Sequence, residues 1–168
     1  MADGSYIIND HLVIVGSKSL RIVASASPFS LANTTSMGDL HTYTGQNSGH
    51  PTTGTVGLWV YMQSGEITSV TLRLGSSASN YTEIAGVKTY TDGTDTQDGW
   101  NYFVFRLKNG TETGTPNWTA VSYTKLTFTS ATTPTCVIDY LTIGTGDEIG
   151  LNGLGERITN YTVTTTTY

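Results

Sequence analysis

Apolar residues recur at every second position in several short stretches in the middle of the chain. In residues 67–74, for example, Val70, Leu72 and Leu74 share one face of an extended chain, and polar residues take the other face. No window of eleven residues shows the spacing of an amphipathic helix. The pattern therefore predicts an all-β protein with strands at residues 56–62, 67–74, 100–107, 121–129 and 136–143.

The predicted strands indicate two sheets packed face to face. Residues 56–62 are apolar on both faces, which is typical of a strand at the centre of a sandwich. The last of the strands carries Val137, Leu141 and Ile143, with Asp139 among them. The side chains expected to form the core between the sheets are Leu58, Leu72, Phe103, Phe105 and Leu126.

The two ends of the chain differ from its middle. Two apolar stretches, 6–8 and 12–15, flank a polar tripeptide and predict a tight hairpin. Residues 27–54 have little pattern and predict a long connection with one short strand near residues 40–43. The expected parts of the chain are a hairpin or attachment segment at 1–16, the sandwich at 17–144, and a Gly-rich loop with a Thr-rich C-terminal strand at 145–168.

The composition predicts a surface rich in Thr and Ser and poor in charge. Charged residues make up 12% of the 168 residues, and the net charge is −5. Without a basic stripe, nucleic acid is not an expected partner, and no apolar run is long enough to span a bilayer. The N-terminal residues lack the features of a secretory signal, so we expect synthesis in the cytosol. A Thr-rich β surface made without a signal is typical of virion parts, which predicts a virion location.

Few residues offer catalytic chemistry, and we predict that the chain is not an enzyme. The three histidines fall in polar loops without metal-ligand spacing. Cys136 begins a strand expected to be buried, which favours a core thiol over a nucleophile. Two other possibilities stay open, namely a carboxylate pair for glycoside hydrolysis and a cation site formed by Asp92, Asp95 and Asp98.

Aromatic residues are the strongest indication of a ligand. Flat rings pack on the C–H faces of sugars, and polar side chains beside them can bond the hydroxyl groups. The residues expected to line the outer face of one sheet in this way are Trp59, Tyr61, Arg73, Tyr102, Arg106 and Tyr123. The competing interpretation is that Trp59 and Trp100 only fill the core or its rim.

Several stretches within residues 17–144 resemble one family of domains. They include Ser19-Leu-Arg-Ile-Val, Leu58-Trp-Val-Tyr, Ser69-Val-Thr-Leu-Arg-Leu-Gly-Ser-Ser, Gly99-Trp-Asn, Gly114-Thr-Pro-Asn-Trp and Ile138-Asp-Tyr-Leu. In this order they resemble the jelly-roll domains of the carbohydrate-binding-module type that are frequent in bacteriophage structural proteins. The resemblance implies a two-sheet antiparallel jelly-roll β-sandwich.

The same resemblance implies one metal site. Many relatives hold a structural Ca²⁺ through an aspartate in the position of Asp139, together with backbone oxygens near the N-terminus. Tyr140 stands at the neighbouring position, where relatives often carry a second acid. A structural Ca²⁺ is therefore the only cofactor expected.

The leading hypothesis is a non-enzymatic accessory protein of a bacteriophage particle, such as a capsid decoration, head-fibre or tail protein. Its expected partners are other virion proteins or copies of itself, contacted through residues 6–15 and 158–168, and a surface glycan. Residues 158–168 favour an extended backbone but lack the apolar face that would fix a register inside one chain. The alternative is a carbohydrate-binding module, and a glycan-active enzyme domain is the third hypothesis.

Overall fold

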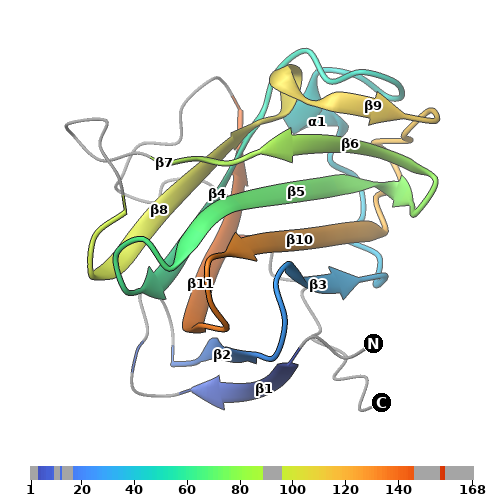
Figure 1. Cartoon of the computed structure of the whole chain (residues 1–168). Coiled ribbons are helices and arrows are strands. Elements are labelled where there is room, and N and C mark those ends of the chain that lie inside the picture. Colours follow the sequence, from blue (N-terminus) through green and yellow to red (C-terminus); the bar gives the residue numbers. More distant parts are fainter. Residues whose placement is uncertain (1–3, 10–11, 13–16, 89–95, 146–155, 158–168) are drawn as a thin grey trace.

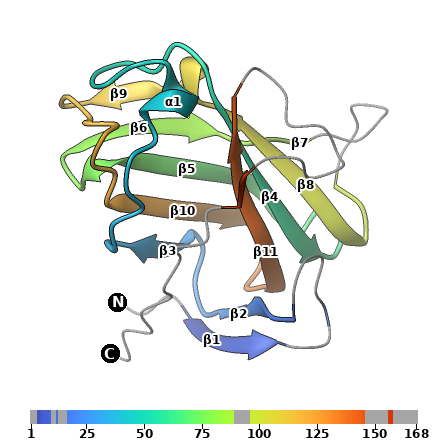
Figure 2. The same cartoon turned by 180° about the vertical axis from the view of Figure 1, so that it is seen from behind.

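Two antiparallel sheets pack face to face in the computed structural model, which describes residues 4–9, 12, 17–88, 96–145 and 156–157 (Figure 1). Sheet A has the strand order β1-β2-β11-β4-β8-β7, with β12 also paired to β11, and sheet B has the order β3-β10-β5-β6-β9. Sheet B lies in front in Figure 1, and sheet A lies in front in the reverse view of Figure 2. The predicted all-β jelly-roll sandwich is confirmed.

Sheet A consists of β1 (Gly4–Asn9), β2 (Ser19–Ala24), β4 (Thr55–Met62), β7 (Val87–Lys88), β8 (Gly99–Arg106), β11 (Thr135–Gly144) and β12 (Glu156–Arg157). Sheet B consists of β3 (Phe29–Asn33), β5 (Ile67–Ser77), β6 (Asn80–Ala85), β9 (Thr111–Thr113) and β10 (Tyr123–Ser130). Two short helical turns, α1 (His41–Thr44) and η1 (Leu107–Asn109), complete the described elements. Neither turn approaches the length and apolar content of a membrane-crossing helix.

Side chains from the inner faces of both sheets form one apolar core. Phe29 of β3 and Phe128 of β10 stack within it, with ring centroids 5.0 Å apart. The residues expected in this core are confirmed, since each is at most 1% exposed: Leu58, Leu72, Phe103, Phe105 and Leu126. Period-two alternation is therefore a correct guide to the inner face of each of their strands.

Strand β11 contains a β-bulge. Asp139 lies opposite Trp59 of β4, but Thr142 lies opposite Gly57, so β11 has one extra residue between these two pairs. Tyr140 falls within this interval and has a left-handed φ of 53°, which is uncommon for a residue with a side chain.

The bulge changes which residues of β11 point inward. Cys136 and Ile138 belong to the core before the bulge, and Ile143 belongs to it afterwards. Val137 instead lies opposite Tyr61 on the outer face. A regular strand would have placed Val137 and Ile143 on the same face, as alternation alone suggests.

The N-terminal strand β1 pairs with β2, which follows the expected hairpin in the sequence. β1 lies antiparallel to β2, with Tyr6 opposite Ile22. The expected turn and second arm fall mainly on residues 10–11 and 13–16, which lie outside the described residues. The proposed division of the chain at residue 16 stays a prediction.

The connection between β3 and β4 contains a helical turn where a short strand was expected near residues 40–43. This turn, α1, ends at Gly45, whose φ of 68° lets its N–H donate to the carbonyl oxygen of His41. The indole of Trp118, which is fully buried, donates to the carbonyl oxygen of Gly49 at 2.6 Å. That bond ties the connection to the loop that precedes β10.

Replacing Phe105 by alanine tests the assignment of the core. Because the ring is fully buried, Phe105→Ala should lower the free energy of unfolding by about 3–5 kcal/mol. Chemical denaturation followed by tryptophan fluorescence measures the change. Val87→Ala, at a side chain that is 50% exposed, is the control and should cost less than about 1 kcal/mol. Equal effects of the two substitutions would contradict the assignment.

Candidate functional site

The six residues expected to share one sheet face lie on two different sheets. Arg73 and Tyr123 belong to β5 and β10 of sheet B. The other four belong to β4 and β8 of sheet A: Trp59, Tyr61, Tyr102 and Arg106. The expectation of one shared face is therefore wrong, because strands with the same alternation belong to different sheets. That either set binds a glycan stays a prediction.

On the outer face of sheet B, charged and aromatic side chains occupy two adjacent rows that run across the strands. From β10 through β5 to β6, one row is Lys125, Arg73 and Glu83, and the next is Tyr123, Gly75 and Tyr81. The residues between them along each strand point inward. We call the following set the tyrosine–arginine face: Arg73, Tyr81, Glu83, Tyr123 and Lys125.

Arg73 connects the members of this face. Its Nε donates to Oε2 of Glu83 at 2.5 Å, and its guanidinium carbon lies 4.7 Å from the centroid of the Tyr81 ring, within cation–π range. The hydrogen bond to Glu83 raises the pKa of Arg73. The side chains of Arg73 and Glu83 are 35% and 41% exposed, so a ligand can reach both. The rings of Tyr81 and Tyr123 lie 6.0 Å apart with an interplanar angle of 46°.

Gly75 lies between the two tyrosines, and its position requires a glycine. A Cβ atom there would lie 2.2 Å from the carbonyl oxygen of Asn80 and 2.5 Å from Cα of Tyr81. Nearby, the hydroxyl of Ser122 donates to the carbonyl oxygen of Ser76 at 2.7 Å and holds this end of β5 against the start of β10. Gly75 is itself buried, so the absence of a side chain here lets the neighbouring strand and the Tyr81 side chain pack against its backbone.

Small side chains form a third row on this outer face. The row on the other side of the charged residues consists of Ser30, Thr127, Thr71 and Ala85. Since neighbouring strands lie 4.7–4.9 Å apart, the five strands of the sheet make a face roughly 19 Å wide. Flat rings, hydrogen-bonding groups and small side chains over this width suit an elongated polar ligand that crosses the strands.

On the outer face of sheet A, the aromatic rings contact one another. Trp59 and Tyr102 lie opposite each other with ring centroids 4.9 Å apart, and Tyr61 and Trp100 pair edge-on at 5.5 Å. Tyr102 is 3% exposed, and burial raises the pKa of its hydroxyl group. These contacts favour the packing interpretation of Trp59 and Trp100.

Asp139, the residue implied to hold Ca²⁺, lies beside the bulge of β11 and is 7% exposed. Its Oδ1 accepts a hydrogen bond from the N–H of Tyr140 at 2.7 Å. Among the described residues, no three acidic, histidine or cysteine side chains gather as metal ligands. Most of the N-terminal segment implied as a ligand lies outside the described residues, so Ca²⁺ stays a prediction. Of the three aspartates considered as a loop cation site, only Asp98 is described, and it accepts the N–H of Ser64 at 2.9 Å.

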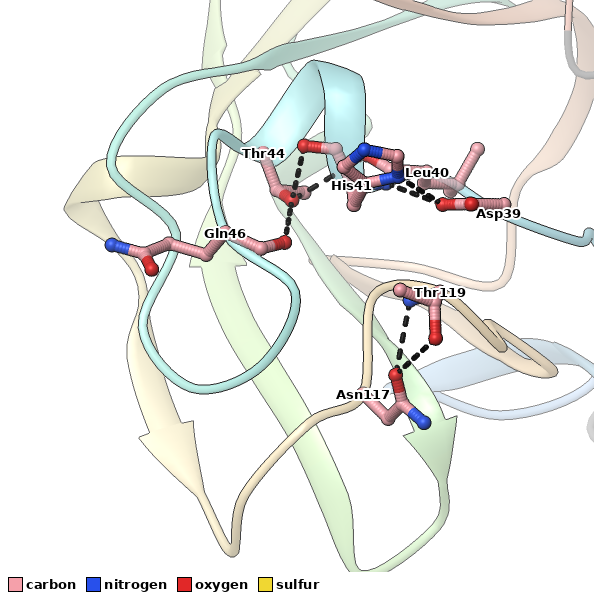
Figure 3. A network of polar contacts seen from close by, with 7 residues as sticks. All are labelled: Asp39, Leu40, His41, Thr44, Gln46, Asn117 and Thr119. Atoms are coloured by element: carbon pink, nitrogen blue, oxygen red, sulfur yellow. Dashed lines mark hydrogen bonds and ion pairs between the residues drawn. The ribbon is translucent and has the colours of Figure 1, made fainter.

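Of the two described histidines, His41 takes part in a local contact, and Nε2 of His50 lies 3.1 Å from the carbonyl oxygen of Lys108. Nδ1 of His41 lies 2.7 Å from Oδ1 of Asp39, and hydrogen bonds from the His41 backbone N–H and ring lower the pKa of Asp39. Figure 3 shows this pair beside two further local sets of contacts, one around Thr44 and one joining Asn117 to Thr119. All three sets join residues close in sequence, and they account for the local turns without a ligand.

No protein-family model matches the sequence, and no curated protein matches it significantly. Several solved structures that share its fold are carbohydrate-binding modules. A family 30 module matches with a TM-score of 0.56 at 13% identity, over 86% of this chain and 76% of that chain. The family 30 module of a cellulosomal cellulase from Clostridium thermocellum matches with a TM-score of 0.56 at 14% identity, over 86% of this chain and 84% of that chain.

A third similar structure holds the CBM22-1 and GH10 modules of endo-1,4-β-D-xylanase 10B from Clostridium thermocellum, complexed with xylohexaose. Its TM-score is 0.51 at 14% identity, over 86% of this chain and 25% of that chain. At these identities the likeness establishes the β-sandwich fold of carbohydrate-binding modules. The ligand has to be argued from the surface of this chain.

Sequence patterns alone do not single out Tyr81, Glu83 and Lys125. For the first two, the sequence offers one signal, the apolar Ile84 two positions after Thr82, and the structure buries both of these side chains. An alternating strand at residues 80–85 would therefore turn Tyr81 and Glu83 outward. Residues 80–85 carry only one aliphatic side chain on the inner face, Ile84, which makes a weak pattern. The pairing with β5 is needed to recognise these residues as a strand.

The reactivity of Cys136 tests the conclusion that it is a core thiol. Burial raises the pKa of this thiol to about 12. Since the thiolate is the reactive form, the native protein should react with a thiol reagent at pH 8 at least about 100-fold more slowly than the unfolded chain, whose thiol has a pKa near 8.5. Absorbance after addition of Ellman's reagent, with and without denaturant, measures both rates, and Cys136→Ser gives the blank. Similar rates would show an accessible thiol.

Proposed function

We propose that this protein is a carbohydrate-binding module that holds a glycan chain on the tyrosine–arginine face. The observation that carries the proposal is the row of Tyr123, Gly75 and Tyr81, in which two rings flank a glycine beside the Arg73–Glu83 pair. The half-buried Tyr81 ring offers a flat surface to sugar C–H groups, with Tyr123, which is 8% exposed, packed beside it. The ion pair offers donors and acceptors to hydroxyl groups. The fold shared with carbohydrate-binding modules supports the proposal.

The contacts on sheet B favour it over sheet A as the binding surface. The rings of Trp59 and Tyr102 lie against each other, and Tyr102 is almost fully buried. On sheet B, Arg73 and Glu83 each keep more than a third of the side chain exposed. A ligand can therefore reach these polar groups and the half-buried Tyr81 ring beside them, while Tyr123, which is 8% exposed, packs next to that ring.

The same face favours binding over hydrolysis. Glycoside hydrolysis ordinarily requires two carboxyl groups on either side of the scissile bond, roughly 5–10 Å apart. Among the paired outer positions of β3, β10, β5, β6 and β9, Glu83 is the only acidic residue, and Arg73 already holds its carboxylate. We therefore propose that the protein binds its glycan without cleaving it.

Substitution of Tyr81 tests the proposed surface. Tyr81→Ala removes a partly exposed ring and should weaken binding to the recognised polysaccharide at least about tenfold, as for an aromatic residue central to an interface. Tyr81→Phe keeps the ring and should retain most of the affinity. Affinity electrophoresis against a panel of soluble plant, algal and bacterial polysaccharides finds the ligand, and calorimetry then measures the change.

Tyr61→Ala is the matched control, because it removes a half-buried tyrosine from the outer face of sheet A. It should leave binding unchanged. If Tyr61→Ala weakens binding and Tyr81→Ala does not, the glycan binds sheet A and the proposed surface is wrong. If no polysaccharide of the panel is bound, the proposal of carbohydrate binding fails.

A second candidate function is that of an accessory protein located on a bacteriophage particle and attached through its terminal segments. The observation that favours it is the position of β1 as an outer strand of sheet A, with no described strand on its far side. Such an edge offers N–H and C=O groups to a strand from another chain. Residues 158–168, the other expected attachment segment, lie outside the described residues.

Purified particles test this second candidate. The full-length protein should be found on them by immunoblotting, and a chain that ends at Glu156 should be lost from them while its thermal unfolding stays cooperative. Absence of both chains from the particles would rule out the virion function and leave carbohydrate binding unaffected.

A further inference from the structure

The tyrosine–arginine face carries an excess of positive charge among its described residues. Lys125 lies directly opposite Arg73 in the register of β10 and β5, and like charges in opposite positions on neighbouring strands repel each other. Glu83 forms an ion pair with Arg73, whereas Lys125 forms none with a described residue. The chain has only 8 Lys and Arg against 13 Asp and Glu. A generally basic composition therefore does not explain two adjacent cations on this face.

We infer that the glycan recognised by this face is anionic and that Lys125 binds its acidic group. The inference rests on the proposed carbohydrate-binding function and specifies its ligand. Tyr123 and Lys125 lie two residues apart on β10 and project from the same face of the sheet. The charged row of Lys125, Arg73 and Glu83 therefore lies next to the row of Tyr123, Gly75 and Tyr81. A sugar chain that crosses the strands from Tyr81 past Tyr123 would bring a substituent next to Lys125.

Arg73 and Lys125, the two cations of the charged row, differ in how favourably each can bind an anion. The carboxylate of Glu83 already holds Arg73, and it would repel a second anion on that side. Lys125 is separated from Glu83 by the whole width of β5. An anion beside Lys125 gains a charge-assisted hydrogen bond and screens the lysine from Arg73. The acidic group of the ligand is therefore assigned to the β10 side of the face.

Pairs of polysaccharides that differ only in charge test this inference. Polygalacturonate and its highly methyl-esterified form share one backbone and differ in free carboxylates, and dextran sulfate and dextran differ in sulfates. The wild-type protein should bind the anionic member of one pair about tenfold more tightly than its neutral counterpart, as expected for one charge-assisted hydrogen bond. The pair that shows the preference identifies the acidic group. The preference should shrink as sodium chloride is added.

Lys125→Gln should abolish the preference, and Lys125→Arg, which keeps the charge, should retain it. Lys18→Gln is the matched control, since it removes one positive charge from an exposed residue outside the face. Equal binding of the members of both pairs, or equal effects of Lys125→Gln and Lys18→Gln, would overturn the inference. If the inference is overturned but Tyr81→Ala still weakens binding, the proposed carbohydrate-binding function stands and its ligand is neutral. Loss of Tyr81 dependence as well would remove both proposals.

Discussion

The packing of two apolar sheet faces against each other is the constraint on which the rest of this molecule depends. Because side chains alternate along a strand, burial of Leu72 and Leu126 turns their neighbours Arg73 and Lys125 outward. A shift of β10 by one residue would bury Lys125 without a partner and expose Leu126, at a cost comparable with the net stability of a domain of this size. The register that forms the core therefore also places the charged row on the surface.

This dependence explains how much of the fold was predictable from the sequence. Inner positions such as Phe103 and Phe105 follow from local alternation, and the structure confirms them. Local patterns do not contain the order of strands within a sheet. Trp59 and Arg73 both occupy outward positions of alternating strands, but β4 and β5 belong to different sheets. Only contacts between residues distant in sequence separate them, and for this reason the expected binding residues were divided between two faces.

Irregular backbone accounts for the other differences between the predicted and the observed structure. The bulge of β11 includes Tyr140 with a left-handed φ, and no glycine or asparagine marks the position in the sequence. The helical turn α1 has four residues, which is too short to produce a periodic pattern. Gly75 could be noticed in the sequence, but its role could not, because the atoms that exclude a Cβ belong to Asn80 and Tyr81 on the neighbouring strand. The candidate site is thus a property of strand pairing more than of any local motif.

The contacts of the few charged side chains differ between the surface that only completes the fold and the surface proposed to bind a ligand. Asp39 accepts a backbone hydrogen bond that closes a local turn, and Asp98 accepts one from Ser64 in the connection between β4 and β5, so both charges are used within the structure. Lys125 instead faces a like charge across the strands and forms no ion pair with a described residue. An arrangement that is slightly unfavourable in the unbound protein becomes favourable when an anion arrives, because binding then relieves repulsion as well as adding a contact. On a surface made mostly of Thr and Ser, that difference supports the proposed anionic ligand more directly than the aromatic rings do, since rings also serve as packing on sheet A.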